Sequence, residues 1–242
     1  MKPLQRIFCV LTAFLVPCLL FSADLSTQRK IHESPGFIFY AEDSRDYSEL
    51  FDLLERKNAD FRNLFGTSLS EKIKVYIFST QLTFSRCVFN SEEPVMNVTG
   101  LADHVSLRFY ITSFYDSCKP RERLLQTPVH ELVHLYFPSQ WVWIREGTAC
   151  YLAEMLTPDS AEDLPSRISE LHFYSRGEEE NKRAYNYSGW IIKYIFEECL
   201  GGSMKRFRQF SRTPSDFSIL GFDGEASFFE GWKSYMRTAS KQ

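Results

Sequence analysis

The sequence lacks three features that would each point to a particular class of protein. It has no basic excess, because 28 Lys and Arg stand against 31 Asp and Glu and the net charge is −3. A nucleic-acid-binding protein would show a basic stripe or patch, so nucleic acid is not an expected partner. No internal repeat or low-complexity tract is visible. The longest apolar run, residues 7–21, is shorter than the ~20 residues of a membrane-spanning helix, and Pro17 interrupts it.

The first 23 residues have the organisation of a secretory signal. Lys2 and Arg6 precede the apolar run, and the small residues Ser22 and Ala23 follow it. This order of basic, apolar and small residues predicts that residues 1–23 direct export. The rest of the chain would then be periplasmic, bound to the cell envelope or secreted.

Two other interpretations of this segment remain open. Phe21 is a poor residue at the third position before a cleavage site that follows Ala23, so the segment could instead remain as a membrane anchor. Residues 15–18, Leu-Val-Pro-Cys, loosely match a bacterial lipoprotein signal, although Pro17 stands where a small residue belongs. In both cases the chain would be tethered to a membrane through its N-terminus.

The cysteines form no CxxC pair, which is unlike a disulfide-dense scaffold. Two of the six lie in the export segment. The four that remain are an even number, which in an exported chain permits up to two disulfides. Buried free thiols are an equally good interpretation of their wide, irregular spacing. These four residues are Cys87, Cys118, Cys150 and Cys199.

Residues 24–242 are expected to form a single domain, because 44% hydrophobic content at this length suits one sizeable core. Alternating runs predict strands at 36–40, 73–78 and 105–111. Helical periodicity predicts helices at 46–65, 129–137, 144–156, 166–174, 187–200 and 228–236. Gly66 should end the first helix, and Pro128 should lie in the first turn of the second. Strands come first and helices after, which favours an α+β fold with a small, mostly antiparallel sheet.

The segment His130-Glu131-Leu132-Val133-His134 carries the clearest chemical signal. On a helix, two histidines four positions apart project from one face, about one turn apart. Both imidazoles can then reach one Zn²⁺ at about 2.0–2.1 Å. Glu131 projects beside the metal and can accept a proton from the attacking water. With only five histidines in the chain, a chance HExxH has odds on the order of one in a hundred.

An open catalytic zinc site needs a third protein ligand, and Glu146 is the best candidate. It lies near the start of the next predicted helix, within residues 141–149. A turn at Pro138-Ser-Gln140 would let this helix cross the first one and return a carboxylate to the metal. The small residue Gly147 would let the two helices pack closely.

Together, the two motifs resemble a known family. His130-Glu-Leu-Val-His134 followed by Trp143-Ile-Arg-Glu146-Gly147-Thr-Ala149-Cys-Tyr151 is similar to the HExxH and WxxEGxAxY helices of gluzincin metallopeptidases. The most similar group is the peptidase-MA-like family, small relatives of the catalytic core of aminopeptidase N and thermolysin. The two motifs are fairly specific, and weaker similarity extends over residues 35 to 205. The resemblance implies a zincin-like fold, with a helical subdomain after the sheet and the HExxH helix at the active site.

The resemblance also implies roles for individual residues. Zinc would be bound by His130, His134 and Glu146, with Glu131 as general base and acid. Gluzincins generally add a Tyr or His that hydrogen-bonds the developing oxyanion. The first candidate for that role is Tyr185, followed by Tyr187 and His104. Peptide substrates would bind by strand addition along an edge strand, for which residues 105–111 are the candidate.

Cys150 departs from the family pattern. In several gluzincins, the residue four positions after the ligand glutamate is an acid that orients a ligand histidine. A thiol orients a histidine poorly, so zinc affinity could be lower than in the larger relatives. Cys150 is therefore expected to be a buried thiol, with approach to the metal as the alternative.

These patterns predict a zinc-dependent peptidase that hydrolyses peptide or protein substrates. Two alternatives from other classes remain open. One is a catalytically inactive, zinc-binding envelope or scaffold protein of the same fold, and the other is a zinc-free envelope lipoprotein in which the motif is accidental. The intact Glu131 favours the enzyme, because a binding module has no need of a general base. The sequence does not indicate the cleavage specificity or the oligomeric state. It also does not distinguish an endopeptidase from an exopeptidase.

Overall fold

The structure, a computed structural model, describes residues 25–95, 98–113, 115, 120–157, 163–175 and 177–239. The expected export segment, residues 1–23, and Cys118 lie outside the described residues. None of the helices in the described part of the chain is long and apolar enough to cross a membrane.

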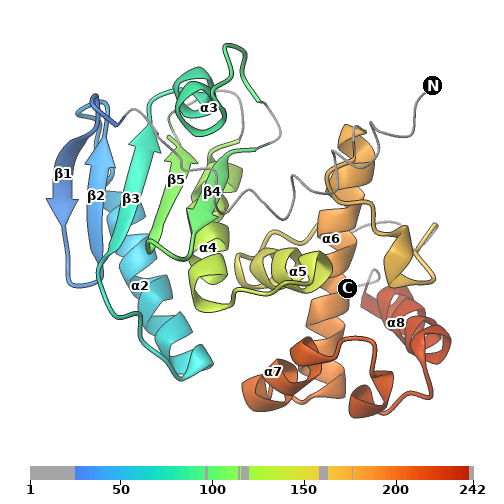
Figure 1. The fold of residues 1–242 in the computed structure, drawn as a ribbon. Helices are drawn as coiled ribbons and strands as arrows, with labels where there is room; N and C mark the ends of the chain where they lie inside the picture. The colour runs from blue at the N-terminus through green and yellow to red at the C-terminus, as the bar shows by residue number, and fades with distance from the viewer. Residues whose placement is uncertain are drawn as a thin grey trace.

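In the part of the chain that the structure describes, five strands form one mixed sheet (Figure 1). The inner pairs β2–β3 and β3–β5 are parallel, whereas the outer strands β1 and β4 are each antiparallel to their neighbour. The α+β class is therefore confirmed, and the expectation of a mostly antiparallel sheet is wrong. In spatial order the strands are β1 (Arg29–Glu33), β2 (Phe37–Ala41), β3 (Ile73–Phe78), β5 (Arg108–Thr112) and β4 (Gly100–Asp103).

The parallel pairs follow from the helices that separate the strands. A crossover helix returns the chain to the same end of the sheet, so the next strand runs in the same direction. The helix α2 (Ser48–Phe65) makes this connection between β2 and β3, and α3 (Gln81–Phe89) follows β3. As predicted, α2 ends at Gly66, whose φ of +59° lies in the left-handed region that glycine favours.

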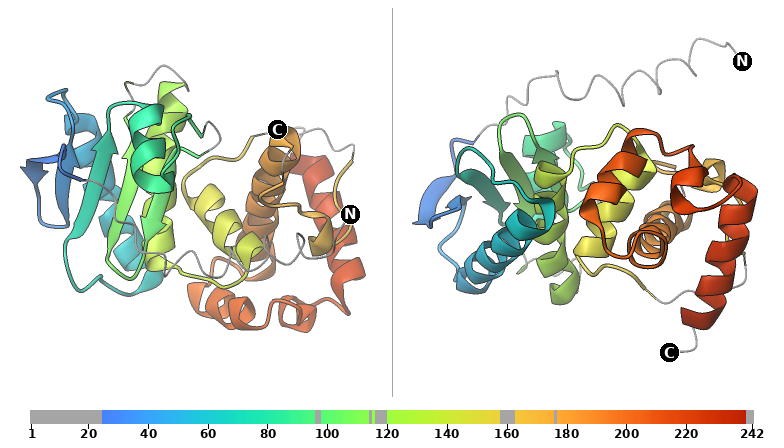
Figure 2. Two further views of the ribbon diagram at one scale, coloured as in Figure 1. Left: turned by 45° about the horizontal axis from the view of Figure 1, so that its top comes forward. Right: turned by 90° about the horizontal axis from the view of Figure 1, so that it is seen from below.

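Helices cover both faces of the sheet. Val75 and Ile77 of β3 belong to the large hydrophobic cluster that includes α2 and α4 (Arg121–Tyr136). Tyr76 and Phe78, which alternate with them, belong to a smaller cluster beneath α3. A strand that is apolar on both faces is the pattern expected of a sheet buried between helices. The two faces can be followed in the further views of Figure 2.

On the side of the sheet nearest α4, the edge strand is β4. The expectation that residues 105–111 form the edge strand is wrong, because β5 is paired on both sides and residues 104–107 form a turn. One carboxylate oxygen of Asp103 accepts hydrogen bonds from the backbone N–H groups of Val105 and Ser106, each at 3.1 Å. These hydrogen bonds turn the backbone after Asp103, so β4 ends there and β5 begins at Arg108.

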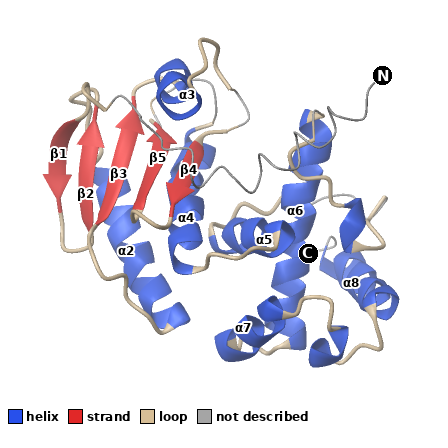
Figure 3. Ribbon diagram, in the orientation of Figure 1, coloured by secondary structure: helices blue, strands red, loops and turns tan. Residues whose placement is uncertain are grey.

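The helices that follow α4 form the second half of the molecule (Figure 3). Helix α5 packs between α4 on one side and α6 on the other, and so connects the two halves. One hydrophobic cluster continues from Phe39 in β2 to Trp232 in α8. The helices are α5 (Val142–Leu152), α6 (Glu178–Tyr194), α7 (Met204–Arg212) and α8 (Glu225–Ala239).

Helix α4 begins earlier than its sequence suggests. It starts at Arg121, so Pro128 lies in the helix interior and not in the first turn. An interior proline removes one backbone hydrogen bond at a cost of about 3 kcal/mol. The burial of every side chain from Thr127 to Val133 offsets that cost through packing.

Three other helix predictions differ from the structure. Helix α5 ends at Leu152, before the predicted end at 156. Residues 166–174 contain only a 3₁₀ turn at Ile168–Glu170. Helix α6 begins at Glu178, nine residues before the predicted start, because an acidic, polar first half precedes its apolar half.

Candidate metal centre

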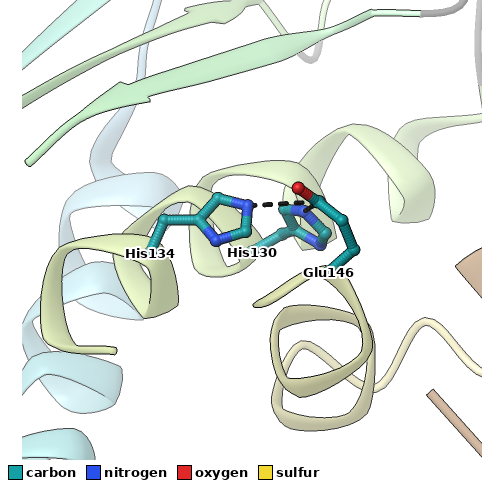
Figure 4. Close-up of side chains that lie close together, drawn as sticks. All are labelled: His130, His134 and Glu146. Atoms are coloured by element: carbon teal, nitrogen blue, oxygen red, sulfur yellow. Dashed lines mark hydrogen bonds and ion pairs between the residues drawn. The ribbon is translucent and has the colours of Figure 1, made fainter. Parts of the chain in front are cut away.

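Helix α4 places both histidines of the HExxH segment on one face. The two imidazole rings are perpendicular, and their centroids are 4.7 Å apart. His130 Nε2 lies 3.3 Å and His134 Nε2 lies 3.4 Å from the same atom, Oε2 of Glu146 (Figure 4). The three metal-ligand candidates that were predicted from the sequence therefore converge on one point.

Helix α5 supplies Glu146 from the opposite side, and Gly147 fixes its position. A Cβ atom at Gly147 would lie 2.5 Å from the backbone oxygen of Ser188 in α6. The glycine therefore permits close contact between α5 and α6, and the expectation that it faces the HExxH helix is wrong. By allowing α5 to pack tightly on α6, Gly147 sets where α5 presents Glu146 to α4.

The ligand atoms fit a metal ion in spacing and chemistry. One nitrogen from each histidine and one oxygen of Glu146 all lie within 4.8 Å of one another. Tetrahedral zinc ligands at 2.0–2.1 Å from the ion are about 3.3–3.4 Å apart, which matches both distances between the histidines and Glu146. Two imidazoles and one carboxylate also form a known catalytic zinc donor set. The buried His130, His134 and Glu146 group can hold a metal ion.

The charge state of Glu146 is favourable for binding a cation. Burial by itself would raise the pKa of this carboxyl. The charges and hydrogen bonds of His134 and His130 outweigh burial and hold the pKa of Glu146 well below its usual value. Glu146 is therefore an anion at neutral pH, with Oε2 directed at the two imidazoles.

The outer ring nitrogens of the two histidines differ in their surroundings. His130 Nδ1 lies 3.9 Å from the Sγ atom of Cys150, whereas His134 Nδ1 is buried and has no hydrogen-bond partner among the described residues. Because Cys150 is on the Nδ1 side of His130, it faces away from the point where the Nε2 atoms meet Glu146. Burial and the charge of Glu146 raise the pKa of the Cys150 thiol. At this position the buried-thiol interpretation holds.

Cys150 and Cys199 both carry free thiols in the structure. The arrangement with two disulfides that the cysteine count permitted is therefore not formed.

Glu131 lies between α4 and the edge strand β4. Its carboxylate accepts a hydrogen bond from the backbone N–H of Ala102 in β4. Gly100 in the same strand approaches so closely that a Cβ atom there would lie 2.6 Å from Glu131 Oε1. Burial, and then the nearby charge of Glu146, raise the pKa of Glu131 to about 7. A carboxyl with this pKa can both accept and donate a proton near neutral pH.

The candidates for an oxyanion-binding group are placed very differently. The ring centroid of Tyr185 is 6.5 Å from that of His130, so Tyr185 borders the centre. Tyr187 packs edge-on against Trp232 in the core, with ring centroids 6.2 Å apart. His104 is exposed in the turn between β4 and β5. Tyr185 is therefore the candidate whose ring lies against the histidine cluster.

Two residues that the sequence did not suggest contact the other oxygen of Glu146. The Nε atom of Arg145 donates to Oε1 at 3.0 Å, and the hydroxyl of Tyr174 donates to the same oxygen at 3.3 Å. Arg145 directly precedes Glu146, so its proximity could have been inferred from the motif. Tyr174 could not, because it lies in an irregular segment with a left-handed backbone (φ +58°).

A surface hollow of about 550 Å³ lies beside this cluster. Tyr174 both lines the hollow and contacts Glu146, whereas none of the three candidate ligands lines the hollow. The other lining residues are Val142, Leu171, His172, Phe173, Ser175 and Glu180.

No protein-family model matches the chain, and no curated protein shows significant sequence similarity to it.

Proposed function

We propose that this protein is a zinc-dependent peptidase of the gluzincin type. The observation that carries the proposal is the convergence of His130 Nε2 and His134 Nε2 on one oxygen of Glu146. Glu131 supplies a buried carboxylate beside this group. A metal-binding module needs the three ligands alone, whereas a metallohydrolase also needs a base in this position.

Zinc is the metal that suits this donor set. Imidazole nitrogens are ligands that magnesium and calcium rarely use, since both prefer oxygen. Three protein ligands leave the fourth tetrahedral position open, as catalytic zinc sites require. The zincin-like relationship proposed from the two helical motifs is compatible with the mixed sheet followed by helices.

In the proposed reaction, Glu131 moves the protons. Zinc, when bound by His130, His134 and Glu146, would polarise the scissile carbonyl and lower the pKa of a water molecule. Glu131 accepts a proton from the attacking water and then donates it to the leaving amine. A tyrosine hydroxyl at the centre donates a hydrogen bond to the substrate oxygen as its negative charge develops. The water thus adds OH to the carbonyl carbon and H to the leaving amine.

The edge strand β4 suits binding of an extended peptide. Its outer edge is unpaired by any described strand, and its residues Gly100 and Ala102 adjoin Glu131. A peptide added to this edge would form backbone hydrogen bonds close to the general base. Substrate addition is therefore assigned to Gly100–Asp103, in place of residues 105–111. The adjoining hollow beside Tyr174 provides room for a substrate side chain.

Export remains part of the proposal on sequence grounds. The basic, apolar and small-residue order of residues 1–23 supports secretion or attachment to the envelope. Peptides or proteins outside the cytoplasm would then be the substrates.

The proposal is tested by measuring zinc content and peptide cleavage in matched variants. Wild-type protein should bind one zinc ion and cleave members of a peptide library, as detected by mass spectrometry. Glu131→Gln should retain zinc and lose about 10²–10⁴-fold in cleavage rate, whereas His134→Ala should lose zinc. Glu154→Gln, an exposed change on α5's C-terminal side, is the control and should behave as wild type.

Three results would overturn this assignment. Equal cleavage by Glu131→Gln and wild type would show that Glu131 is not the general base. Stoichiometric zinc with no cleavage of any peptide would favour the inactive scaffold, and absence of zinc would favour an accidental motif.

A further inference from the structure

Tyr174 is joined to the candidate metal centre by three polar contacts. Its hydroxyl accepts a hydrogen bond from Arg145 Nη2 at 2.9 Å and donates one to Glu146 Oε1 at 3.3 Å. A further hydrogen bond links it to the hydroxyl of Tyr185. The phenol therefore lies next to the ligand carboxylate, on the side of its second oxygen, Oε1.

The position of Tyr174 differs from that of a structural tyrosine. Its side chain is 58% exposed, so it contributes little to the core. Its backbone has a φ of +58°, a region that residues with a Cβ adopt at a cost of about 1–2 kcal/mol. Such strain in an exposed residue beside a reactive group is the pattern typical of functional sites.

Arg145 gives the Tyr174 hydroxyl freedom to change its acceptor. The Nε atom of Arg145 also donates to Glu146 Oε1, at 3.0 Å. If the tyrosine O–H rotates toward another oxygen, Glu146 Oε1 keeps one strong, charge-assisted hydrogen bond. Donation from Arg145 Nη2 to the phenol oxygen also polarises the O–H bond and makes it a better donor.

Tyr185 is less accessible to a substrate. It is partly buried, its ring packs edge-on against Phe173, and Tyr174 is hydrogen-bonded to its hydroxyl. Tyr174, by contrast, lines the hollow beside the centre. Of the two phenols, the outer one is the more open to an entering substrate.

We propose that Tyr174 is a catalytic residue: its hydroxyl, held by Arg145 beside Glu146, donates the hydrogen bond that stabilises the oxyanion of the substrate. Tyr185 is then a positioning residue that acts through its hydrogen bond to Tyr174. This inference rests on the proposed peptidase function and assigns within it a role that the sequence pattern gave to Tyr185.

The test compares three Tyr→Phe variants, each of which removes one hydroxyl and nothing else. The zinc-loaded full chain is assayed for kcat and KM on a library peptide that the wild type cleaves, and zinc affinity is measured by chelator competition. Tyr174→Phe should lower kcat by about 10²-fold, the loss typical of one oxyanion donor. Its KM and zinc affinity should stay close to wild type, because the lost bond forms only in the transition state. Tyr185→Phe should cost far less.

The control is Tyr151→Phe. Tyr151 lies on the same helix as Glu146, but its hydroxyl donates to Glu197 and not to the cluster, so kcat should not change. Three results would overturn the inference: an undiminished kcat in Tyr174→Phe, a loss confined to Tyr185→Phe, or weaker zinc binding with kcat preserved at saturating zinc. Failure of the peptidase proposal is distinct, because there the wild type itself would cleave nothing.

Discussion

A Cβ atom at Gly100 would lie 2.6 Å from Oε1 of Glu131. Strand β4 and helix α4 can therefore approach this closely because residue 100 is a glycine. The same hypothetical atom would be 2.7 Å from Cγ2 of Thr127 and 2.8 Å from Cγ of Glu131. The proposed general base therefore occupies the space that any other residue at position 100 would need. The edge strand and the reactive carboxylate are adjusted to each other at this contact.

Substituting Gly100→Ala should impair cleavage without removing the metal. The methyl group would displace the Glu131 carboxylate, and a misplacement of about 1 Å costs on the order of 10²-fold in rate. Zinc content should be unchanged, because the three ligands come from α4 and α5. Gly177→Ala is the control, since its nearest neighbour would be 3.5 Å away, at an ordinary contact distance. A fully active Gly100→Ala variant would show that Glu131 is not positioned by β4.

Substituting Gly147→Ala should both destabilise the fold and weaken zinc binding. The added methyl group would meet the backbone oxygen of Ser188 at 2.5 Å, and backbone cannot move aside as a side chain can. Overpacking of this kind lowers the free energy of unfolding by about 1–3 kcal/mol. Because α5 would shift, Glu146 would move relative to both histidines. Urea unfolding and zinc competition measure the two effects, and Gly224→Ala, with open space around it, should show neither.

The stability of the metal-free protein should depend on pH through Glu131. The pKa of its carboxyl is about 7 in the folded state, against an ordinary value of 4.5. The folded state therefore binds the proton more tightly, so this stabilising contribution is complete below pH 4.5 and is lost as the pH rises through 7. Between pH 5 and pH 8 the loss is on the order of 2 kcal/mol.

The Glu131→Gln variant isolates this contribution from the titration of the histidines, because its amide side chain does not titrate. With chelator present, wild type should lose more unfolding free energy than the variant as the pH rises. Urea unfolding of both proteins at pH 5 and pH 8 measures the difference between them. The same difference at both pH values would mean that Glu131 is ionised throughout the range.

Zinc should stabilise the folded protein by mass action. At a free zinc concentration 100 times the dissociation constant, the free energy of unfolding should rise by about 2.7 kcal/mol. His134→Ala should abolish this rise, because two remaining ligands hold zinc poorly. Magnesium at the same concentration should have no effect, since it requires oxygen ligands. Equal stabilisation of wild type and His134→Ala by zinc would place the ion elsewhere on the protein.

Much of the first half of the fold could be predicted from local pattern. The strand at 73–78 and the end of α2 at Gly66 agree with the structure. Pairing of the strands could not be predicted in the same way. Which strands are neighbours, and in which direction they run, depends on contacts between residues far apart in the sequence, such as Val75 with Phe109. For that reason the parallel centre of the sheet and the identity of its edge strand were predicted wrongly.

For the candidate site, too, local features could be predicted from the sequence, whereas contacts between separate elements could not. By itself, the sequence determined that His130 and His134 share one helical face, because the helix repeat places residues four apart on the same side. It also determined the type of the third ligand, since Glu146 stands at a fixed place in a helical motif. Only the tertiary structure decided that α5 brings Glu146 Oε2 to both imidazoles, that β4 lies against Glu131, and that Arg145 and Tyr174 contact Glu146 Oε1. These relations depend on how separate elements pack, and side-chain packing between elements has no periodic signature in the chain.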